Sequence, residues 1–380
     1  MRIRRLCMSG KVKSVKLEEE IELLYGKALT KKQRVHGNIP VYGSNGIIDY
    51  HNKGYFIGPG IILGRKGTVG SVEYSIGNFW AIDTTYVVRT RSTEDDTMYW
   101  YYFLKMLNLN QMNTHSVIPT LNRDNVYSLT VNVLESYSER RKVANILSSI
   151  DEKIETNNQI NKKLETMAQT IFKHWFVDFE FPNENGDPYK SSGGSMFESK
   201  LGMIPKGWEV KELREVVEFE YGKPLKRENR KEGVIPVYGS NGIIGFHNES
   251  IVKGPGIVIG RKGNPGTVIY VHEDFYPIDT TFYVISKSRF EDFGFIYMLL
   301  KNQNLTTLST GSVVPGLNRN LLYMNKVLFP NKSMIVKFEG VIKSINNMIY
   351  HNYSQNKHLM SIRDTLLPKL VSGEIRVPVK

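Results

Sequence analysis

One stretch of ten residues occurs twice in this chain, letter for letter, and it constrains the fold more than any other feature. The sequence Ile-Pro-Val-Tyr-Gly-Ser-Asn-Gly-Ile-Ile runs from Ile39 to Ile48 and again from Ile235 to Ile244, so the copies are 235 − 39 = 196 residues apart. Solenoid units repeat every ~20–50 residues. A period of 196 residues therefore indicates a duplicated domain.

Further identical segments recur at the same offset. The first copies are Tyr25–Lys27, Gly58–Ile61, Gly64–Gly67, Ile82–Thr85 and Leu121–Arg123, and the second copies are Tyr221–Lys223, Gly254–Ile257, Gly260–Gly263, Ile278–Thr281 and Leu317–Arg319. The duplication thus extends over most of a domain without a net insertion. Two copies in one chain favour a pseudo-twofold arrangement.

The composition is typical of a globular chain with a polyanionic partner. The 380 residues are 41% hydrophobic and carry a formal net charge of +12. A strongly basic balance indicates nucleic acid, and the alternative is a basic protein without such a partner. No apolar run reaches the ~18–20 residues of a membrane-spanning helix. Cys7 is the only cysteine, which excludes a disulfide framework and a cysteine zinc cluster, and we expect a cytoplasmic protein.

Each copy has the pattern of a compact, sheet-rich α+β domain. Short runs rich in Val, Ile and Tyr, such as Pro40–Tyr42, Ile61–Leu63 and Tyr86–Val88, are typical of strands. Asn45 precedes a glycine, and Asn-Gly pairs favour the positive φ angles of a hairpin turn. The aromatic run Met98–Leu107 has a helical pattern.

Two long helices are predicted, one after each copy. Glycine and proline are absent from residue 138 to residue 181, and apolar residues from Val143 onward step by alternating fours and threes. That spacing is a heptad seam, and it recurs from Phe338 onward. Each helix of about 35 residues would be ~50 Å long at ~1.5 Å per residue. We predict that the two helices pair as an antiparallel coiled coil.

Four asparagines within the seam predict the register of this pair. If facing positions keep a constant residue sum, Asn157 faces Asn356 (157 + 356 = 513) and Asn161 faces Asn352 (161 + 352 = 513). Buried asparagines fix the register of a coiled coil at a cost in stability. We therefore expect these four residues to determine the helix register.

Polar residues in predicted loops are the candidates for contact with nucleic acid. Arg and Lys suit phosphates and guanine, and Asn suits adenine. The candidates are Lys27, Asn45, Arg65, Lys66, Asn122 and Arg123 with their second copies Lys223, Asn241, Arg261, Lys262, Asn318 and Arg319. The alternative is that residues shared by both copies exist only to form the fold. Gly64–Gly67 is either a phosphate-contacting loop or a plain hairpin turn.

No catalytic or metal-binding motif is complete in the sequence. The segments at Gly26-Lys27 and Gly222-Lys223 lack the Ser or Thr of a P-loop. Asp83 and Asp279 lack the second acid and the lysine of a metal-dependent nuclease, and His51 and His247 have no second histidine or cysteine nearby. We expect no catalytic residue and no metal site. A stand-alone DNA-processing enzyme that uses these two aspartates and a non-DNA coiled-coil scaffold stay open as alternatives.

An aromatic segment follows the first predicted helix. Trp175, Phe176 and Phe179 lie within the run Phe172–Pro182. Packing at the end of the helix is one interpretation, and an exposed patch that docks a partner subunit is the other.

Two segments outside the ten-residue repeat carry a family resemblance. They are Trp175–Phe179 after the first helix and Leu366–Ile375 near the C-terminus, and the segment Ile204–Trp208 adds to them. With these segments, the chain resembles the specificity subunit of type I restriction-modification systems over essentially its whole length.

The resemblance implies an architecture. It predicts target-recognition domains over residues 1–137 and 196–333, a central conserved helix and linker over 138–195, and a C-terminal conserved helix over 334–380. The expected fold class is α+β, with two duplicated sheet-rich target-recognition domains separated by two long antiparallel coiled-coil helices about a pseudo-twofold axis.

The resemblance also implies a function. Each recognition domain would read one half of a bipartite site in double-stranded DNA, and the helices would set the spacing and dock two methyltransferase subunits. Motor-nuclease subunits would join the complex, and AdoMet, ATP and Mg²⁺ would belong to these partners, with no cofactor in this chain. Because the two domains are near-duplicates, we expect a target that is nearly palindromic.

Overall fold

The computed structural model describes residues 12–112, 119–288, 290, 292–310 and 316–378, and Cys7 lies outside these ranges. The chain divides into two compact units. Unit 1 comprises residues 1–156 and 355–380, and unit 2 comprises residues 157–354. Each of the two long helices therefore contributes one part to each unit.

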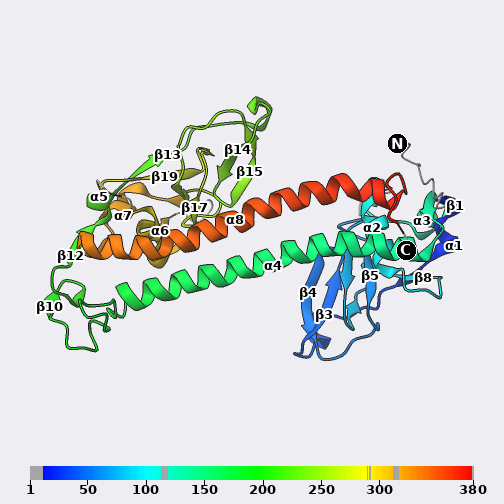
Figure 1. The fold of residues 1–380 in the computed structure, drawn as a ribbon, viewed down its shortest axis with the longest axis horizontal. Helices are drawn as coiled ribbons and strands as arrows, with labels where there is room; N and C mark the ends of the chain where they lie inside the picture. Colours follow the sequence, from blue (N-terminus) through cyan, green and yellow to red (C-terminus); the bar gives the residue numbers. More distant parts are fainter. Residues whose placement is uncertain (1–11, 113–118, 289, 291, 311–315, 379–380) are drawn as a thin grey trace, which may run out of the picture. The chain divides into compact units, whose positions relative to one another are not determined.

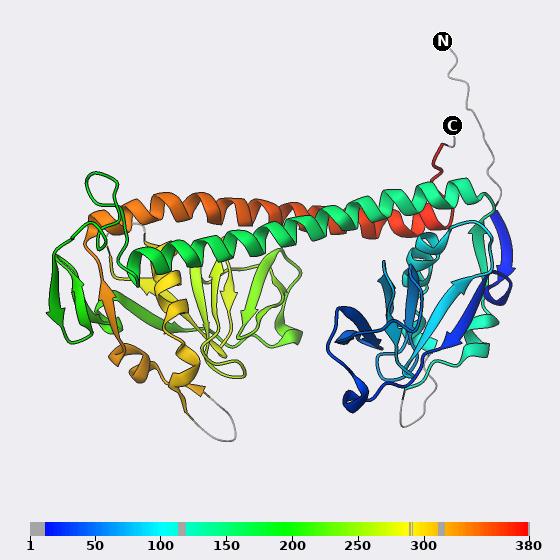
Figure 2. The same ribbon diagram turned by 90° about the horizontal axis from the view of Figure 1, so that it is seen from below.

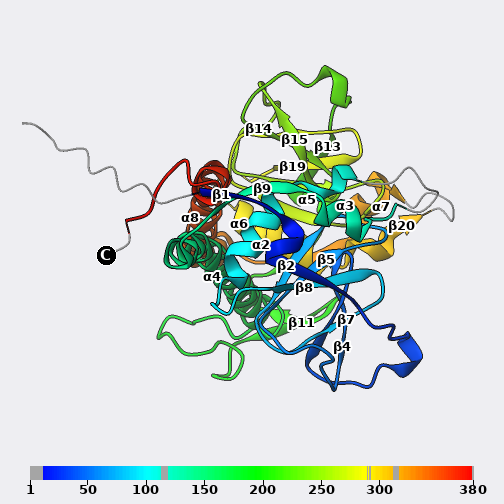
Figure 3. The same ribbon diagram turned by 90° about the vertical axis from the view of Figure 1, so that its right-hand side faces the viewer.

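Unit 1 is built around a four-stranded antiparallel sheet in the order β2-β8-β5-β6, of which β5 and β8 are labelled in Figure 1. A three-stranded sheet β4-β3-β7 and the pair β1-β9 complete it, and Figure 3 shows β2, β8 and β5 next to one another. The strands are β1 (Val12–Lys16), β2 (Ile21–Tyr25), β3 (Ile39–Gly43), β4 (Gly46–His51), β5 (Gly60–Gly64), β6 (Val72–Ser75), β7 (Trp80–Ala81), β8 (Thr85–Thr90) and β9 (Thr130–Leu134).

Short helices cover the sheet of unit 1. They are α1 (Leu17–Glu20), α2 (Thr97–Met106) and α3 (Arg123–Tyr127), with the 3₁₀ turns η1 (Lys31–Gln33) and η2 (Leu109–Met112). Helix α2 is the aromatic run predicted from the sequence, and its Tyr99, Trp100 and Phe103 are buried in the core of this unit. Aromatic side chains bury a large apolar area, so the packing of α2 against the sheet stabilises the core of unit 1.

Unit 2 repeats the strand order of unit 1. Its main sheet is β13-β19-β16-β17, its second sheet is β15-β14-β18, and β12-β22 takes the place of β1-β9. Tyr25 pairs with Tyr86 in unit 1, and Tyr221 pairs with Phe282 in unit 2, each shifted by 196 residues. The domain duplication predicted from the sequence is therefore confirmed down to strand register.

The elements of unit 2 include a hairpin, β10-β11, and a short pair, β20-β21. In chain order they are β10 (Met196–Ser199), β11 (Gly202–Pro205), β12 (Glu209–Glu212), α5 (Leu213–Val216), β13 (Val217–Tyr221), η3 (Arg227–Asn229), β14 (Ile235–Gly239), β15 (Gly242–His247), β16 (Gly256–Gly260), β17 (Val268–Val271), β18 (Tyr276–Pro277), β19 (Thr281–Ser286), α6 (Phe293–Asn302), η4 (Leu305–Leu308), β20 (Ser309–Thr310), β21 (Gly316–Leu317), α7 (Arg319–Met324) and β22 (Lys326–Phe329).

The two long helices are α4 (Tyr137–Phe176) and α8 (Lys332–Val371), each of 40 residues. Helix α4 begins one residue before the predicted residue 138, and α8 begins two residues before the predicted residue 334. Within unit 2 their segments lie side by side (Figure 2), and Leu164 and Phe172 of α4 share the core with Phe338 and Ile342 of α8. Neither helix, nor any other in the described part of the chain, is long and apolar enough to cross a membrane.

Hydrogen bonds give the direction of the helix segments inside each unit. In unit 2, Asn352 Nδ2 donates to Asn161 Oδ1 at 2.8 Å, which is the contact predicted from the sequence. In unit 1, Arg363 Nη1 donates to Asp151 Oδ1 at 2.7 Å, and Asn356 Nδ2 donates to the Ile154 carbonyl at 3.5 Å. The residue numbers rise on α4 as they fall on α8, so the paired segments of unit 1 are antiparallel.

The predicted contact between Asn157 and Asn356 joins residues of different units. Asn157 is buried in unit 2 and Asn356 in unit 1. Their mutual contact stays a prediction.

A buried arginine holds the start of α4 in unit 1. Arg140 is 0% exposed, and its Nη1 donates to Glu20 Oε2 at 3.0 Å and to Asp96 Oδ2 at 2.7 Å. Burial raises the pKa of Asp96 in spite of the arginine. Burial also opposes ionisation of Glu20, but hydrogen bonds from Lys13 and Arg140 outweigh it and lower the pKa of that carboxyl.

Unit 2 keeps only one member of this ion cluster. The counterpart of Glu20 is the apolar Val216, and the counterpart of Asp96 is Asp292. The long helices correspond at an offset of 195 residues, so the counterpart of Arg140 is the apolar Ile335. Asp292 is buried, and it accepts a hydrogen bond from Ser286 Oγ at 3.1 Å. Burial raises the pKa of Asp292, because desolvation disfavours the carboxylate.

We predict that Asp292→Asn raises the free energy of unfolding at pH 7. The folded-state pKa of Asp292 lies above its unfolded value, so its contribution to stability is largest below the unfolded pKa and is lost as pH rises through the folded pKa. The advantage of the variant should therefore disappear under acid conditions. Chemical denaturation at pH 7 and at pH 4 measures it.

The matched variant is Asp96→Asn in unit 1. It removes a partner of buried Arg140 and should cost about 3 kcal/mol or more. Equal losses of stability from the two substitutions would contradict this account.

Candidate nucleic-acid interface

An exposed tyrosine between two arginines recurs in both units. In unit 1, the Arg65 and Arg123 guanidinium carbons lie 5.1 and 5.4 Å from the centre of the Tyr25 ring. The ring is 52% exposed although it is flanked by both cations. Stacking on an aromatic face holds a guanidinium in place while its N–H groups stay available. We call this set the Tyr-Arg-Arg cluster of unit 1.

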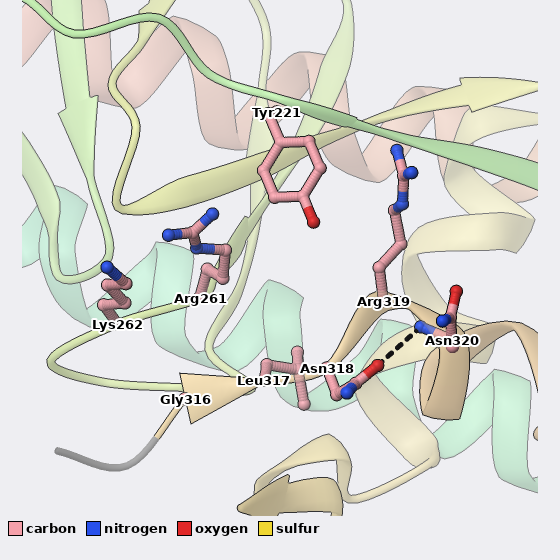
Figure 4. Close-up of a pocket in the computed structure, with 8 residues that line it drawn as sticks. All are labelled: Tyr221, Arg261, Lys262, Gly316, Leu317, Asn318, Arg319 and Asn320. Atoms are coloured by element: carbon pink, nitrogen blue, oxygen red, sulfur yellow. Dashed lines mark hydrogen bonds between the residues drawn. The ribbon is translucent and has the colours of Figure 1, made fainter.

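The Tyr-Arg-Arg cluster of unit 2 has the same geometry. Arg261 and Arg319 lie 5.0 and 4.8 Å from the centre of the Tyr221 ring, which is 43% exposed. Figure 4 shows the ring between the two arginines. The cluster lines a cavity of about 380 Å³ together with Lys262, Gly316, Leu317, Asn318 and Asn320. The cavity is thus cationic and rich in hydrogen-bond donors.

Backbone hydrogen bonds fix the loop that carries Arg65. The amides of Arg65 and Lys66 both donate to the Thr84 carbonyl, at 2.9 and 3.0 Å, and the Leu121 amide donates to the Arg65 carbonyl at 2.8 Å. The repeated Asp-Thr-Thr segment therefore serves as backbone support. Arg65 Nη2 also donates to the Asp83 carbonyl at 2.7 Å.

The same loop is fixed in the same way in unit 2. The Arg261 and Lys262 amides donate to the Thr280 carbonyl, at 2.9 and 3.1 Å, and the Leu317 amide donates to the Arg261 carbonyl at 2.9 Å. The loop is consequently more than a plain hairpin turn, because it is tied to two segments distant in the sequence.

Glycine follows each of the two tyrosines for a steric reason. A β-carbon at Gly26 would collide with the Ile82 carbonyl oxygen, and one at Gly222 would collide with the Ile278 carbonyl oxygen. The chain can pass this point only with glycine, and this close approach places the tyrosine beside the arginine loop.

Two of the predicted contact residues cap helices. Asn122 Oδ1 accepts from the Asp124 amide at 2.8 Å at the start of α3. Asn318 Oδ1 accepts from the Asn320 amide at 2.8 Å at the start of α7. Asparagine is a preferred N-cap residue. The side-chain oxygens of Asn122 and Asn318 therefore stabilise the fold, as in the alternative given for residues shared by both copies.

The turn between β3 and β4 adjoins the arginine loop. Ser44 Oγ donates to the Lys66 carbonyl and to the Thr84 carbonyl, which places the exposed Asn45 next to the cluster of unit 1. In unit 2, Asn241 Oδ1 accepts from Asn264 Nδ2 at 2.8 Å. The structure therefore brings Asn45, Arg65, Lys66, Asn122 and Arg123 together in one unit, and their counterparts in the other.

Two of the four predicted lysines, Lys27 and Lys223, lie at the margin of these clusters. Lys27 is exposed, and its Nζ lies 4.6 Å from the centre of the Tyr55 ring. Lys223 is exposed directly after Gly222. The sequence reasoning missed the tyrosines themselves, although the recurrence of Tyr25-Gly26-Lys27 was the signal that could have identified them.

The aromatic segment after α4 packs inside unit 2. Phe176 is buried, with ring centres 4.9 Å from Phe338 and 5.0 Å from Phe295. The packing interpretation is therefore confirmed for Phe176. Trp175 and Phe179 are half-buried, and a docking role for them stays a prediction.

Within the described ranges, no three His, Cys, Asp or Glu side chains gather as ligands for a metal ion. Asp83 and Asp279, the acids considered for catalysis, are exposed. Asp83 contributes its backbone carbonyl to the site, where it accepts a hydrogen bond from Arg65.

The fold and the clusters define a class of protein with two duplicated α+β domains, each with two half-buried arginines stacked on an exposed tyrosine. The chain belongs to the family described as the type I restriction modification DNA specificity domain, whose sequence profile matches residues 10–166 and 205–338.

Two relatives of this chain are type I restriction enzyme specificity subunits. The type I restriction enzyme MjaIX specificity subunit of Methanocaldococcus jannaschii is 27% identical over 306 residues, which cover 73% of this chain and 69% of the relative. The HindI specificity subunit of Haemophilus influenzae is 23% identical over 334 residues, which cover 68% and 71%. The crystal structure of the S subunit from M. genitalium has the same fold, with a TM-score of 0.65 at 19% identity over 99% of both chains.

We predict that Asn318→Ala lowers the free energy of unfolding by about 1 kcal/mol because α7 loses its N-cap. Asn318→Asp preserves the acceptor oxygen and should retain the stability of the natural protein. Chemical denaturation of the two variants side by side measures the difference. Equal stability of the alanine and aspartate variants would show that the cap is dispensable.

Proposed function

We propose that this chain reads DNA sequence for a type I restriction-modification complex, and that each unit reads one half of a bipartite site in double-stranded DNA. The observation that carries the proposal is the occurrence of one Tyr-Arg-Arg cluster in each unit, with similar stacking distances of 5.1 and 5.4 Å in unit 1 and 5.0 and 4.8 Å in unit 2. Guanidinium groups suit phosphates and guanine. The net charge of +12 adds the long-range attraction that DNA binding uses.

The target is proposed to be nearly palindromic. The eight residues that line the cavity of unit 2 have identical counterparts in unit 1 at all but two positions, 120/316 and 124/320. Two domains related by a pseudo-twofold axis would then bind inverted copies of similar half-sites. The antiparallel direction of the helix segments supports this symmetry.

The helices are proposed to form the coiled coil that separates recognition domains 1–137 and 196–333. In this arrangement they set the spacing between the half-sites, and Asn157 contacts Asn356. Paired asparagines inside an apolar seam fix one register, and the Asn161–Asn352 hydrogen bond is one such pair.

The chain is proposed to catalyse nothing by itself. Two methyltransferase subunits and motor-nuclease subunits would supply AdoMet, ATP and Mg²⁺ chemistry in the cytoplasm. Trp175 and Phe179 are candidate docking residues because they are only half-buried. Methylation or cleavage of DNA by the purified chain alone would instead support the stand-alone enzyme.

The first test measures DNA binding by the chain assembled with its methyltransferase. Arg65→Ala and Arg261→Ala should each weaken binding to the cognate site about tenfold or more. Arg261→Lys should give an intermediate loss because it keeps the charge without the planar fork. The control is Arg214→Ala, since Arg214 is exposed on α5 and pairs with Glu212 at 2.8 Å. A complex that does not bind DNA specifically would refute the proposed function.

The second test maps methylated adenines in cells that express the chain with its methyltransferase. We expect a bipartite target whose halves are nearly inverted copies. Two unrelated half-sites would contradict the palindromic part of the proposal while leaving DNA recognition intact.

A further inference from the structure

The two units share their cation clusters but differ at the turn beside them. Asn241 and its counterpart Asn45 occupy this turn, and both side chains are exposed. Residue 264 in unit 2 is asparagine, whereas its counterpart in unit 1 is Thr68. The difference therefore lies one residue beyond the shared Gly-Arg-Lys-Gly loop.

In unit 2 the two asparagines form an ordered amide pair. Asn264 Nδ2 donates to Asn241 Oδ1 at 2.8 Å. In this bond the nitrogen of the Asn264 amide faces Asn241. One N–H of Nδ2 and the Oδ1 acceptor of Asn264 then remain for a further partner. Asparagine with this pair of groups matches the N7 and N6 edge of adenine in the major groove.

Unit 1 cannot build this pair. Thr68 has a hydroxyl and a methyl group but no amide, so its donor and acceptor share one oxygen atom and cannot match the two separate groups of the adenine edge. The surroundings of the turn differ as well. A β-carbon added at Gly46 would lie 3.7 Å from the Glu73 carboxylate, whereas the counterpart of Glu73 in unit 2 is Ile269.

Arg34 in unit 1 and its counterpart Arg230 in unit 2 also have different hydrogen-bond partners. In unit 1, Arg34 Nη1 donates to Asp49 Oδ2 at 3.0 Å. In unit 2 the counterpart of Asp49 is Gly245, and Arg230 Nη1 donates to the Ile244 carbonyl at 2.7 Å. Unit 1 thus has two carboxylates, Asp49 on β4 and Glu73 on β6, at positions where unit 2 has none.

We infer that Asn264, oriented by Asn241, is a specificity-determining residue that contacts an adenine in the half-site of unit 2. Thr68 gives unit 1 a different preference at the equivalent base pair. The Tyr-Arg-Arg clusters contact the features that the two half-sites have in common, and the turn contacts the base pair at which the half-sites differ. The inference rests on the proposed function and deepens it, because it assigns one difference between the half-sites to one pair of residues.

The test exchanges the two residues in the complete complex with its methyltransferase. Asn264→Thr should reduce methylation of sites with the adenine, relative to other bases there, by about tenfold or more. Thr68→Asn should give the first half-site the same adenine preference and make the target more palindromic. Mapping methylated adenines across the genome reads both changes.

A second variant separates orientation from folding. Asn241→Ala should lower discrimination at that base pair while cognate DNA still binds, whereas Arg261→Ala should weaken binding to every sequence. The control is Glu18→Arg, which introduces the residue found at position 214 of unit 2. Glu18 has a side chain 49% exposed on α1, and this control should leave the target unchanged.

The outcomes distinguish the inference from the function. If the natural complex methylates a bipartite site and both exchanges leave each half-site unchanged, the inference is overturned. If the natural complex recognises no specific site, the proposed function itself fails. Melting temperatures of the exchange variants near that of the natural protein establish that a change in target is a change in recognition.

Discussion

The structure of each unit depends on one carbonyl group that accepts two amides. The Thr84 carbonyl binds the amides of Arg65 and Lys66, and the Thr280 carbonyl binds those of Arg261 and Lys262. Without these bonds the loop after β5 or β16 would lose its attachment to the Asp-Thr-Thr segment. With them, the arginine backbone is fixed and its side chain reaches the tyrosine ring. A net stabilisation of about 0.5–1.5 kcal/mol for each such hydrogen bond favours this one conformation of the loop.

The duplicated cores show which interactions a domain of this type can exchange. Unit 1 buries Arg140 with Glu20 and Asp96, whereas unit 2 has apolar residues at two of these three positions. Buried ion clusters are often replaceable by apolar residues of similar volume without loss of stability. The surface clusters, in contrast, stay the same in both units. The core residues at these positions therefore differ between the units, while the half-buried arginines and the exposed tyrosine are the same.

Much of the fold could be predicted from the sequence because its signals are local or periodic. Repeated segments predicted two domains, Asn-Gly predicted the turn before β4, and heptad spacing predicted α4 and α8. The facing of Asn161 and Asn352 followed from a constant residue sum. Part of the site could be predicted as well, since basic residues in loops are a local signal.

The sequence by itself determined that this chain contains one domain twice, that each copy is followed by a long helix, and that basic residues recur in its loops. Only the tertiary structure decided what those residues do. It assigned Asn122 and Asn318 to helix caps, buried Phe176, and placed Tyr25 and Tyr221 between arginines. The physical reason is that a stacking or hydrogen-bond partner is set by distance in space. Tyr25 and Arg123 are far apart in the sequence, and only the folded sheet brings them together.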